Sequence, residues 1–136
     1  MNLLIVDDDP SVVQLFQDAA EMVEGTQVDV AYSAEDAMSV ALTGEHDMIT
    51  LDIRMPGASG LDIIGLLRNL RPHAIVAVIS GHISPEDAAT AAANADVVMG
   101  KPARMPSFVR LVECAHMVRT ALDEVRSMGR TVSDDP

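Results

Sequence analysis

The 136-residue chain contains no tryptophan, one tyrosine, two phenylalanines and one cysteine, and only nine lysines and arginines stand against 21 aspartates and glutamates. A formal charge of −12 disfavours contact with a phosphate backbone. The scarcity of aromatic rings leaves no platform on which single-stranded bases could stack. We therefore expect no direct binding to nucleic acid.

Long hydrophobic runs are missing as well, although 49% of the residues are hydrophobic. No run approaches the roughly 20 residues that a membrane-spanning helix needs. The start MNLLIVDDD lacks the basic segment of a secretory signal, and the single cysteine, Cys114, cannot form a disulfide within the chain. We therefore expect no membrane span and a cytoplasmic, reducing environment.

Short aliphatic runs alternate with helix-like stretches along most of the chain. The runs are LLIV, VDVAY, MITL, AIVAVI and VVM, which begin at residues 3, 28, 48, 74 and 97. Five segments between and after them carry apolar residues at helical spacing, and cap pairs such as Asp9 with Pro10 mark helix starts. This alternation predicts a single α/β domain in which helices cover both faces of a five-stranded parallel sheet.

The fifth helix is expected to be the longest, running from near Pro106 to near Gly129. The apolar residues at helical spacing within it are Phe108, Leu111, Val112, Ala115, Val118, Leu122 and Val125. This spacing predicts an amphipathic helix with one apolar face. The expected domain covers residues 1–128, and a polar C-terminal tail covers residues 129–136.

Charged or hydroxyl side chains follow four of the five runs. Asp7 and Asp8 follow the first run, Asp52 the third, Ser80 the fourth and Lys101 the fifth. Ligands of open parallel sheets bind beyond the carboxyl ends of the strands, so these side chains should share one site. Carboxylates suit Mg²⁺, and carboxylates, an amine and a hydroxyl together suit phosphoryl transfer to a carboxylate nucleophile.

Four segments occur in order between residues 5 and 102: IVDDD, LDIRMPGASG, VISG and GKP. Together they resemble the receiver domain of bacterial two-component response regulators. The resemblance implies a flavodoxin-like, doubly wound sheet of strand order 2-1-3-4-5. It also implies that a sensor histidine kinase or phosphotransfer protein phosphorylates Asp52, with Mg²⁺ held by Asp7, Asp8, Asp52 and the backbone carbonyl of Arg54.

The same resemblance assigns further roles. Ser80 matches the switch hydroxyl, Lys101 the phosphate-binding lysine, and Arg54 and His82 the positions that tune hydrolysis of the aspartyl phosphate. Phosphorylation in the family reshapes the surface of helix four, strand five and helix five, where partners and dimer mates dock. A homodimer through that surface is therefore an expectation, whereas the output, a downstream protein or an output domain of its own, stays open.

Two positions depart from the family pattern. Val98 stands where a tyrosine or phenylalanine is usual, so the aromatic switch is missing unless Met99 or Met105 replaces it. Ala103 stands where a phenylalanine is common, which should loosen the packing at the start of the fifth helix.

Two other functions compete with this interpretation. A magnesium-dependent phosphatase of the haloacid dehalogenase type needs a second aspartate two residues after the nucleophile, where this chain has Arg54. A degenerate receiver that acts only as a protein-interaction module is kept open by Val98. An acidic cluster alone is more often a solvated loop than a binding site. The histidines His46, His73 and His116 are expected at the surface.

Overall fold

A computed structural model describes residues 1–129, in which five strands alternate with five helices. The strands are β1 (Asn2–Val6), β2 (Gln27–Ala31), β3 (Met48–Leu51), β4 (Ile75–Ser80) and β5 (Val97–Gly100). The helices are α1 (Pro10–Glu21), α2 (Ala34–Thr43), α3 (Gly60–Leu70), α4 (Pro85–Ala92) and α5 (Met105–Met128). The predicted alternation is confirmed, whereas residues 130–136 of the expected tail lie outside the described residues.

The strands form one parallel sheet in the order β2-β1-β3-β4-β5. From β1 the chain crosses to β2 on one side and then returns to β3 on the other side of β1. The strand order therefore reverses between β1 and β3, which is where doubly wound sheets bind their ligands. The predicted fold class and strand order are confirmed.

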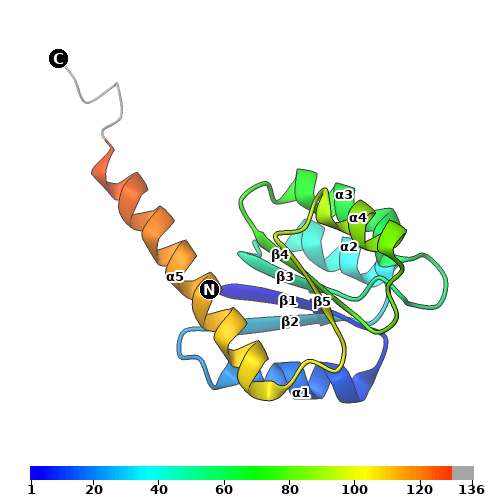
Figure 1. Ribbon diagram of the computed structural model, residues 1–136. Coiled ribbons are helices and arrows are strands. Elements are labelled where there is room, and N and C mark those ends of the chain that lie inside the picture. The colour runs from blue at the N-terminus through cyan, green and yellow to red at the C-terminus, as the bar shows by residue number, and fades with distance from the viewer. Residues whose placement is uncertain (130–136) are drawn as a thin grey trace.

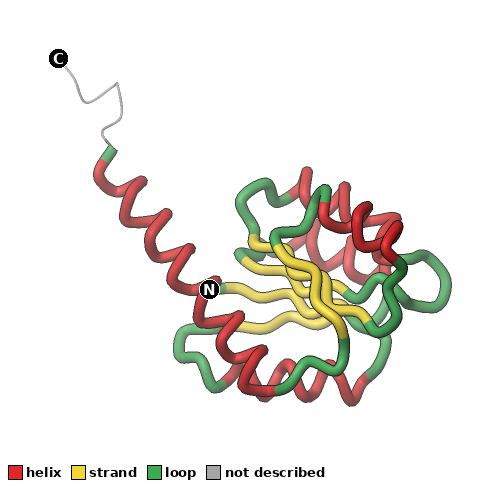
Figure 2. The backbone as a smooth tube through the Cα atoms, in the orientation of Figure 1, coloured by secondary structure: helices red, strands yellow, loops and turns green. Residues whose placement is uncertain are grey.

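Helices cover both faces of the sheet, and each face has its own apolar core (Figures 1 and 2). The first core lies between the sheet and α1 and α5, and in it the rings of Phe16 and Phe108 stack with their centroids 4.2 Å apart. The second core lies between the sheet and α2, α3 and α4. Successive residues of β1 alternate between the two cores, as the period of a strand requires. This double coverage leaves the strand ends free to carry polar residues.

Side-chain caps fix where the helices begin. Asp9 accepts a hydrogen bond from the backbone N–H of Ser11 at the start of α1. Ser59 and Asp62 form a reciprocal capping box at the start of α3. Because each cap ends the loop that follows a strand, the caps hold the loops after β1 and β3 in place.

Helix α5 packs on the sheet only through its first half. Phe108, Val112 and Ala115 are buried, but Val118 is 47% and Val125 63% exposed. Figure 1 shows that this part of α5 extends away from the sheet, so it has no sheet to cover. The helices of residues 1–129 include none that is long and apolar enough to cross a membrane.

Helix α4 is held mainly at its C-terminal end. Ala91 is its one buried residue among residues 85–92. Just beyond α4, the guanidinium of Arg68 on α3 donates to the backbone oxygen of Asn94 at 2.9 Å and to the carboxylate of Asp96 at 2.9 Å. The same guanidinium donates to the backbone oxygen of Ala74 at 2.6 Å. We call these three contacts the Arg68 clasp, and they tie the segment after α4 to α3 and to the residue before β4.

Candidate functional site

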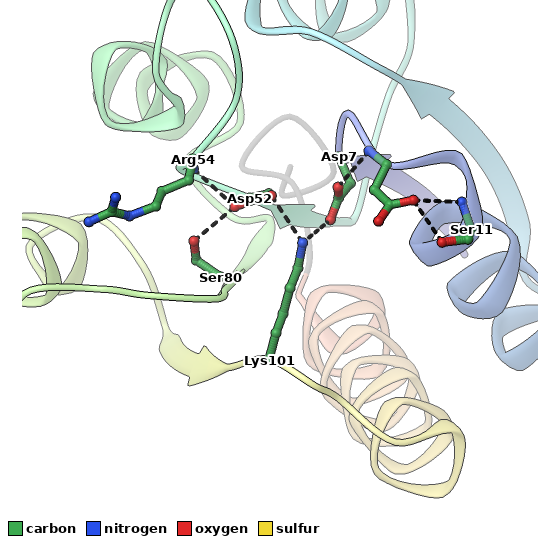
Figure 3. A network of polar contacts seen from close by, with 7 residues as sticks. Asp7, Ser11, Asp52, Arg54, Ser80 and Lys101 are labelled. Atoms are coloured by element: carbon green, nitrogen blue, oxygen red, sulfur yellow. Dashed lines mark hydrogen bonds and ion pairs between the residues drawn. The ribbon is translucent and has the colours of Figure 1, made fainter.

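Four of the predicted site residues meet at the carboxyl edge of the sheet (Figure 3). Asp7 follows β1, Asp52 follows β3, Ser80 ends β4, and Lys101 follows β5. Asp7, Asp52 and Ser80 are buried, with exposures of 1%, 4% and 0%. The topology thus delivers two carboxylates, a hydroxyl and an amine to one place beside the reversal of strand order.

The ammonium of Lys101 bridges the two buried carboxylates. Its Nζ donates to Oδ2 of Asp7 at 2.6 Å and to Oδ2 of Asp52 at 3.0 Å. These are charge-assisted bonds, which are stronger than bonds between neutral groups. One cation therefore partly neutralises two anions that follow different strands.

Oδ1 of Asp52 is bound by two other donors. The Ser80 hydroxyl donates to it at 2.8 Å, and the backbone N–H of Arg54 donates to it at 2.9 Å. With Lys101 on Oδ2, both oxygens of the carboxylate have partners. Asp52 is consequently held in a single orientation toward the edge of the sheet.

The loop after β3 approaches α3 too closely for any side chain at Gly60. A Cβ atom there would lie 2.5 Å from the backbone oxygen of Asp52 and 2.7 Å from Cα of Ile53. The amide of Gly60 also donates to the backbone oxygen of Ile53 at 3.2 Å. This contact holds the backbone of Asp52 against the start of α3 and explains the last glycine of the motif LDIRMPGASG.

For both Asp7 and Lys101, burial shifts the pKa in one direction and the opposite charges nearby shift it in the other. Burial raises the pKa of Asp7, and the hydrogen bond from Lys101 reverses only part of this effect. Burial also opposes the charge of Lys101, but its hydrogen bonds to Asp7 and Asp52 outweigh burial and raise its pKa. Lys101 is therefore firmly charged, while ionised Asp7 costs the folded state free energy.

The exposed rim of the site can hold a cation. One carboxylate oxygen from each of Asp7, Asp8 and Asp52 lies within 4.8 Å of the others, and Asp8 is exposed. Three hard oxygen donors around a site that Lys101 only partly neutralises fit Mg²⁺, which keeps several waters and takes few carboxylates. The donor chemistry therefore agrees with the expected ion.

The side chains of Arg54 and His82 take no part in this network. Arg54 is exposed and points away from Asp52, to which only its backbone N–H is bonded (Figure 3). His82 is exposed and makes no hydrogen bond or ion pair with the site residues in the described part of the chain. Both side chains are free to meet a group that approaches the site from outside.

Val98 and Ala103, the two positions that depart from the family pattern, have different surroundings. Val98 is half-buried and packs in the core that faces α4, whereas Met99 and Met105 pack in the core on the other side of the sheet. These methionines therefore do not take the place of an aromatic ring at Val98. Near Ala103 a cavity of about 290 Å³ lies between α1 and the loop before α5, which agrees with the predicted loose packing.

One histidine lies where the sequence does not predict it. His46 is 3% exposed, and its Nε2 lies 2.8 Å from Oδ2 of Asp29. The pair joins β2 to the loop before β3 at the edge opposite the site, so the expectation of a surface residue is wrong for His46. The partner Asp29 is 17 residues away along the chain, and local pattern gives no sign of the contact.

The sequence matches a family model described as the response regulator receiver domain over residues 3–113. The transcriptional regulatory protein KdpE of Mycobacterium tuberculosis is 27% identical over 123 residues, which are 90% of this chain and 54% of that protein. The transcriptional regulatory protein MalR of Bacillus subtilis is 40% identical over 83 residues, 59% of this chain and 34% of MalR. The chain thus spans about half, or less, of the length of these relatives.

Two solved structures carry bound groups and resemble this chain closely in backbone. A response regulator from Burkholderia pseudomallei with a phosphorylated aspartic acid, calcium ion and citrate is 26% identical, with a TM-score of 0.75 over 99% of this chain and 75% of that one. The response regulator TrrA from Thermotoga maritima, in complex with Mg²⁺ and BeF, is 27% identical, with a TM-score of 0.73 over 84% of this chain and 97% of that one.

Proposed function

Because this chain belongs to the family of response regulator receiver domains, we propose that Asp52 is its phosphoacceptor. The observation that carries the proposal is the hydrogen-bonded set around Asp52, in which Lys101, Ser80 and the Arg54 amide orient one buried carboxylate. Such positioning and charge neutralisation supply most of the catalysis in phosphoryl transfer. The function is that of a signalling module, and self-phosphorylation and hydrolysis of the aspartyl phosphate are its expected chemistry.

In the proposed reaction, an oxygen of the Asp52 carboxylate attacks the phosphorus of a phosphohistidine on a sensor kinase or phosphotransfer protein. The O–P bond forms as the N–P bond breaks, and the released imidazole keeps the electron pair and takes up a proton. Lys101 lies 3.0 Å from Oδ2 of Asp52 and can pair with the transferred phosphoryl oxygens. Ser80 can donate to the same group from the other side.

Mg²⁺ is the cofactor that the site residues fit. Asp7, Asp8, Asp52 and the backbone carbonyl of Arg54 would hold the ion, which supplies charge neutralisation between the carboxylates and the phosphoryl oxygens. Asp8 is the exposed member of the set. It is therefore the residue that an ion from solvent meets first.

The partners follow from the same proposal. A sensor histidine kinase or phosphotransfer protein would supply the phosphoryl group, and the surface of α4, β5 and α5 would pass the signal to a partner or a second copy. Residues 1–128 contain all ten helices and strands of the described part of the chain, and we propose them as the receiver domain. Arg54 and His82 would tune the lifetime of the aspartyl phosphate, because both side chains are exposed in the segments that follow Asp52 and Ser80.

Intact mass after incubation with acetyl phosphate and Mg²⁺ tests the assignment of Asp52. The wild type should gain the mass of one phosphoryl group, and Asp52→Asn should gain none while it keeps the acceptor oxygen that Ser80 and the Arg54 amide bind. Asp18→Asn is the matched control, since Asp18 is exposed on α1. Phosphoryl gain by Asp52→Asn would assign the acceptor to another residue, and no gain by the wild type would favour a degenerate receiver.

A further inference from the structure

The peptide group between Ile53 and Arg54 is hydrogen-bonded on both sides. Its N–H, which belongs to Arg54, donates to Oδ1 of Asp52 at 2.9 Å (Figure 3). Its oxygen, which belongs to Ile53, accepts from the Ser59 hydroxyl at 2.7 Å and from the Gly60 N–H at 3.2 Å. Ser59 is the N-cap of α3 and Gly60 its first residue, so one peptide group links the start of α3 to the Asp52 carboxylate. We call this peptide group and its three hydrogen bonds the Ile53–Arg54 relay.

The Ser59 hydroxyl makes two bonds that serve different purposes. Its oxygen accepts from the backbone N–H of Leu61 at 3.1 Å, and this bond caps α3. Its proton is donated to the Ile53 oxygen, and that bond is no part of the cap. The other half of the cap, from the Ser59 N–H to Oδ2 of Asp62 at 2.9 Å, does not involve Ile53 either. Capping of α3 and orientation of the relay can therefore be separated by substitution.

Donors on the Ile53 oxygen act on Asp52 through the peptide group. Hydrogen bonds in a chain polarise one another, so a carbonyl oxygen that accepts two bonds makes the N–H of its own peptide a stronger donor. Both donors also lie at the N-terminus of α3, where the partial positive charge of a helix is concentrated. The relay therefore strengthens the Arg54 N–H as a donor and fixes the direction in which it meets the carboxylate.

We propose that Ser59 is a positioning residue for phosphoryl transfer to Asp52, and that it acts through the Arg54 N–H. The inference rests on the proposed function and adds a residue to it. A phosphoryl group on Asp52 would lie among the donors that hold the carboxylate, and donors fixed in advance stabilise the charge that develops on its oxygens. The Arg54 side chain is exposed, so the bonds to the Ile53 oxygen are what orient this peptide group.

Phosphorylation rates of the full chain with acetyl phosphate and saturating Mg²⁺, followed by intact mass, test the proposal. Ser59→Asp combined with Asp62→Asn keeps the net charge and both halves of the cap, because Asp and Asn side chains accept the same bonds. It has no proton to give the Ile53 oxygen. Its rate should fall about fivefold, which is part of the roughly hundredfold loss expected when a whole donor is removed from such a site. Asp62→Asn alone is the matched control and should keep the wild-type rate, as should Ser59→Thr, which retains the hydroxyl.

The double variant is a sharper test than Ser59→Ala. A hollow of about 480 Å³ adjoins Ser59, so a water molecule can take the place of a missing hydroxyl there. A carboxylate at position 59 fills that place with an acceptor. The double variant should melt at the wild-type temperature, since its cap is intact.

The NMR signal of the Arg54 amide proton gives a second measurement, on unphosphorylated protein. A weaker hydrogen bond to Asp52 should move this signal upfield in the double variant, whereas Ser59→Thr and Asp62→Asn should leave it in place. A role of Ser59 in capping alone would not move it.

A wild-type rate or an unmoved Arg54 signal in the double variant would overturn the proposal, because the cap would then be all that Ser59 supplies. Equal slowing by Asp62→Asn alone would overturn it too. In each of these cases the wild type still gains its phosphoryl group on Asp52, so the proposed function stands. A wild type that gains none refutes both.

Discussion

The hydroxyl of Ser80 donates a 2.8 Å hydrogen bond to Oδ1 of Asp52, and Ser80 has no exposed surface. The resemblance to receivers implies a hydroxyl that is drawn inward to a phosphoryl group. In this protein Ser80 faces the site and contacts the carboxylate itself. If Asp52 is phosphorylated, Ser80 should exchange a carboxylate oxygen for a phosphoryl oxygen, and we expect residues 81–84 to move with it.

Removing this hydroxyl should separate phosphoryl acceptance from signalling. Ser80→Ala should still gain a phosphoryl group, because Asp52 and Lys101 remain. Its loop at residues 81–84 should show much smaller backbone NMR shift changes with beryllofluoride than the wild type. The lost buried hydrogen bond should lower the free energy of unfolding by roughly 1 to 3 kcal/mol. Ser80→Thr keeps a hydroxyl and is the control, and wild-type shift changes in Ser80→Ala would contradict the exchange.

Mg²⁺ should stabilise the fold by binding at the acidic rim. A hundredfold excess of the ion over its dissociation constant adds about 2.7 kcal/mol to the free energy of unfolding. Asp8→Ala should lose most of the rise in melting temperature that Mg²⁺ produces, because it removes the exposed ligand of the set. Asp18→Ala on α1 should keep the full rise. An unchanged rise in Asp8→Ala would show that the ion binds elsewhere.

The raised pKa of buried Asp7 predicts how stability depends on pH in the absence of divalent cations. The folded state holds the Asp7 proton at higher pH than the unfolded state, whose ordinary pKa is 3.8. The free energy of unfolding should therefore fall as pH rises from 3.8 through the folded pKa. Asp7→Asn should be more stable than the wild type at neutral pH, and the two should converge in acid. Urea unfolding in EDTA measures this difference.

Asp9 provides a control of opposite sign for this pH dependence. Its hydrogen bonds with Ser11 lower its pKa below 3.8, so its ionised form stabilises the folded state above that pH. This contribution is lost as pH falls through the folded pKa. Asp9→Asn should accordingly be no more stable than the wild type at neutral pH. Equal effects of Asp7→Asn and Asp9→Asn would contradict the assignment of the cost to burial of Asp7.

The absence of an aromatic ring at Val98 predicts a localised response. Val98 is half-buried on the side of the sheet that faces α4, and the nearby methionines pack on the other side. With beryllofluoride, the shift changes should be large around residues 81–90 and small at the Val98 methyl groups. Changes at Val98 as large as those in the loop would refute the localised response, and no change outside the site would favour the degenerate receiver.

Most of the fold could be predicted from the sequence because its elements are local. Helix α3 begins at a local cap, because Ser59 and Asp62 form the capping box within four consecutive residues. The gathering of Asp7, Asp52 and Lys101 could also be predicted, because polar residues at strand ends meet whenever the strands are parallel. Ser80 was expected just past the fourth strand, and it is the last residue of β4.

What could not be predicted depends on contacts between distant segments. The apolar periodicity of α5 predicts an apolar face, but it cannot show that the sheet ends near Ala115 and leaves Val125 exposed. His46 is buried by a contact with Asp29 on another strand, so its own neighbours in the sequence do not reveal it. The orientation of Ser80 toward Asp52 likewise depends on side-chain geometry across two strands.

The Arg68 clasp holds the C-terminal end of α4, so the helix can pivot about that end. Asn94 and Asp96 are tied to α3, whereas the start of α4 at Pro85 is exposed and is joined to Ser80 by only four residues. A small displacement at Ser80 should therefore swing the start of α4 through a larger arc than its end. Arg68→Met should remove the contacts that hold this end, so that amide hydrogen exchange speeds up at residues 91–96. In this variant, a displacement of Ser80 should then lead to local unfolding at the end of α4 instead of rotation of the helix.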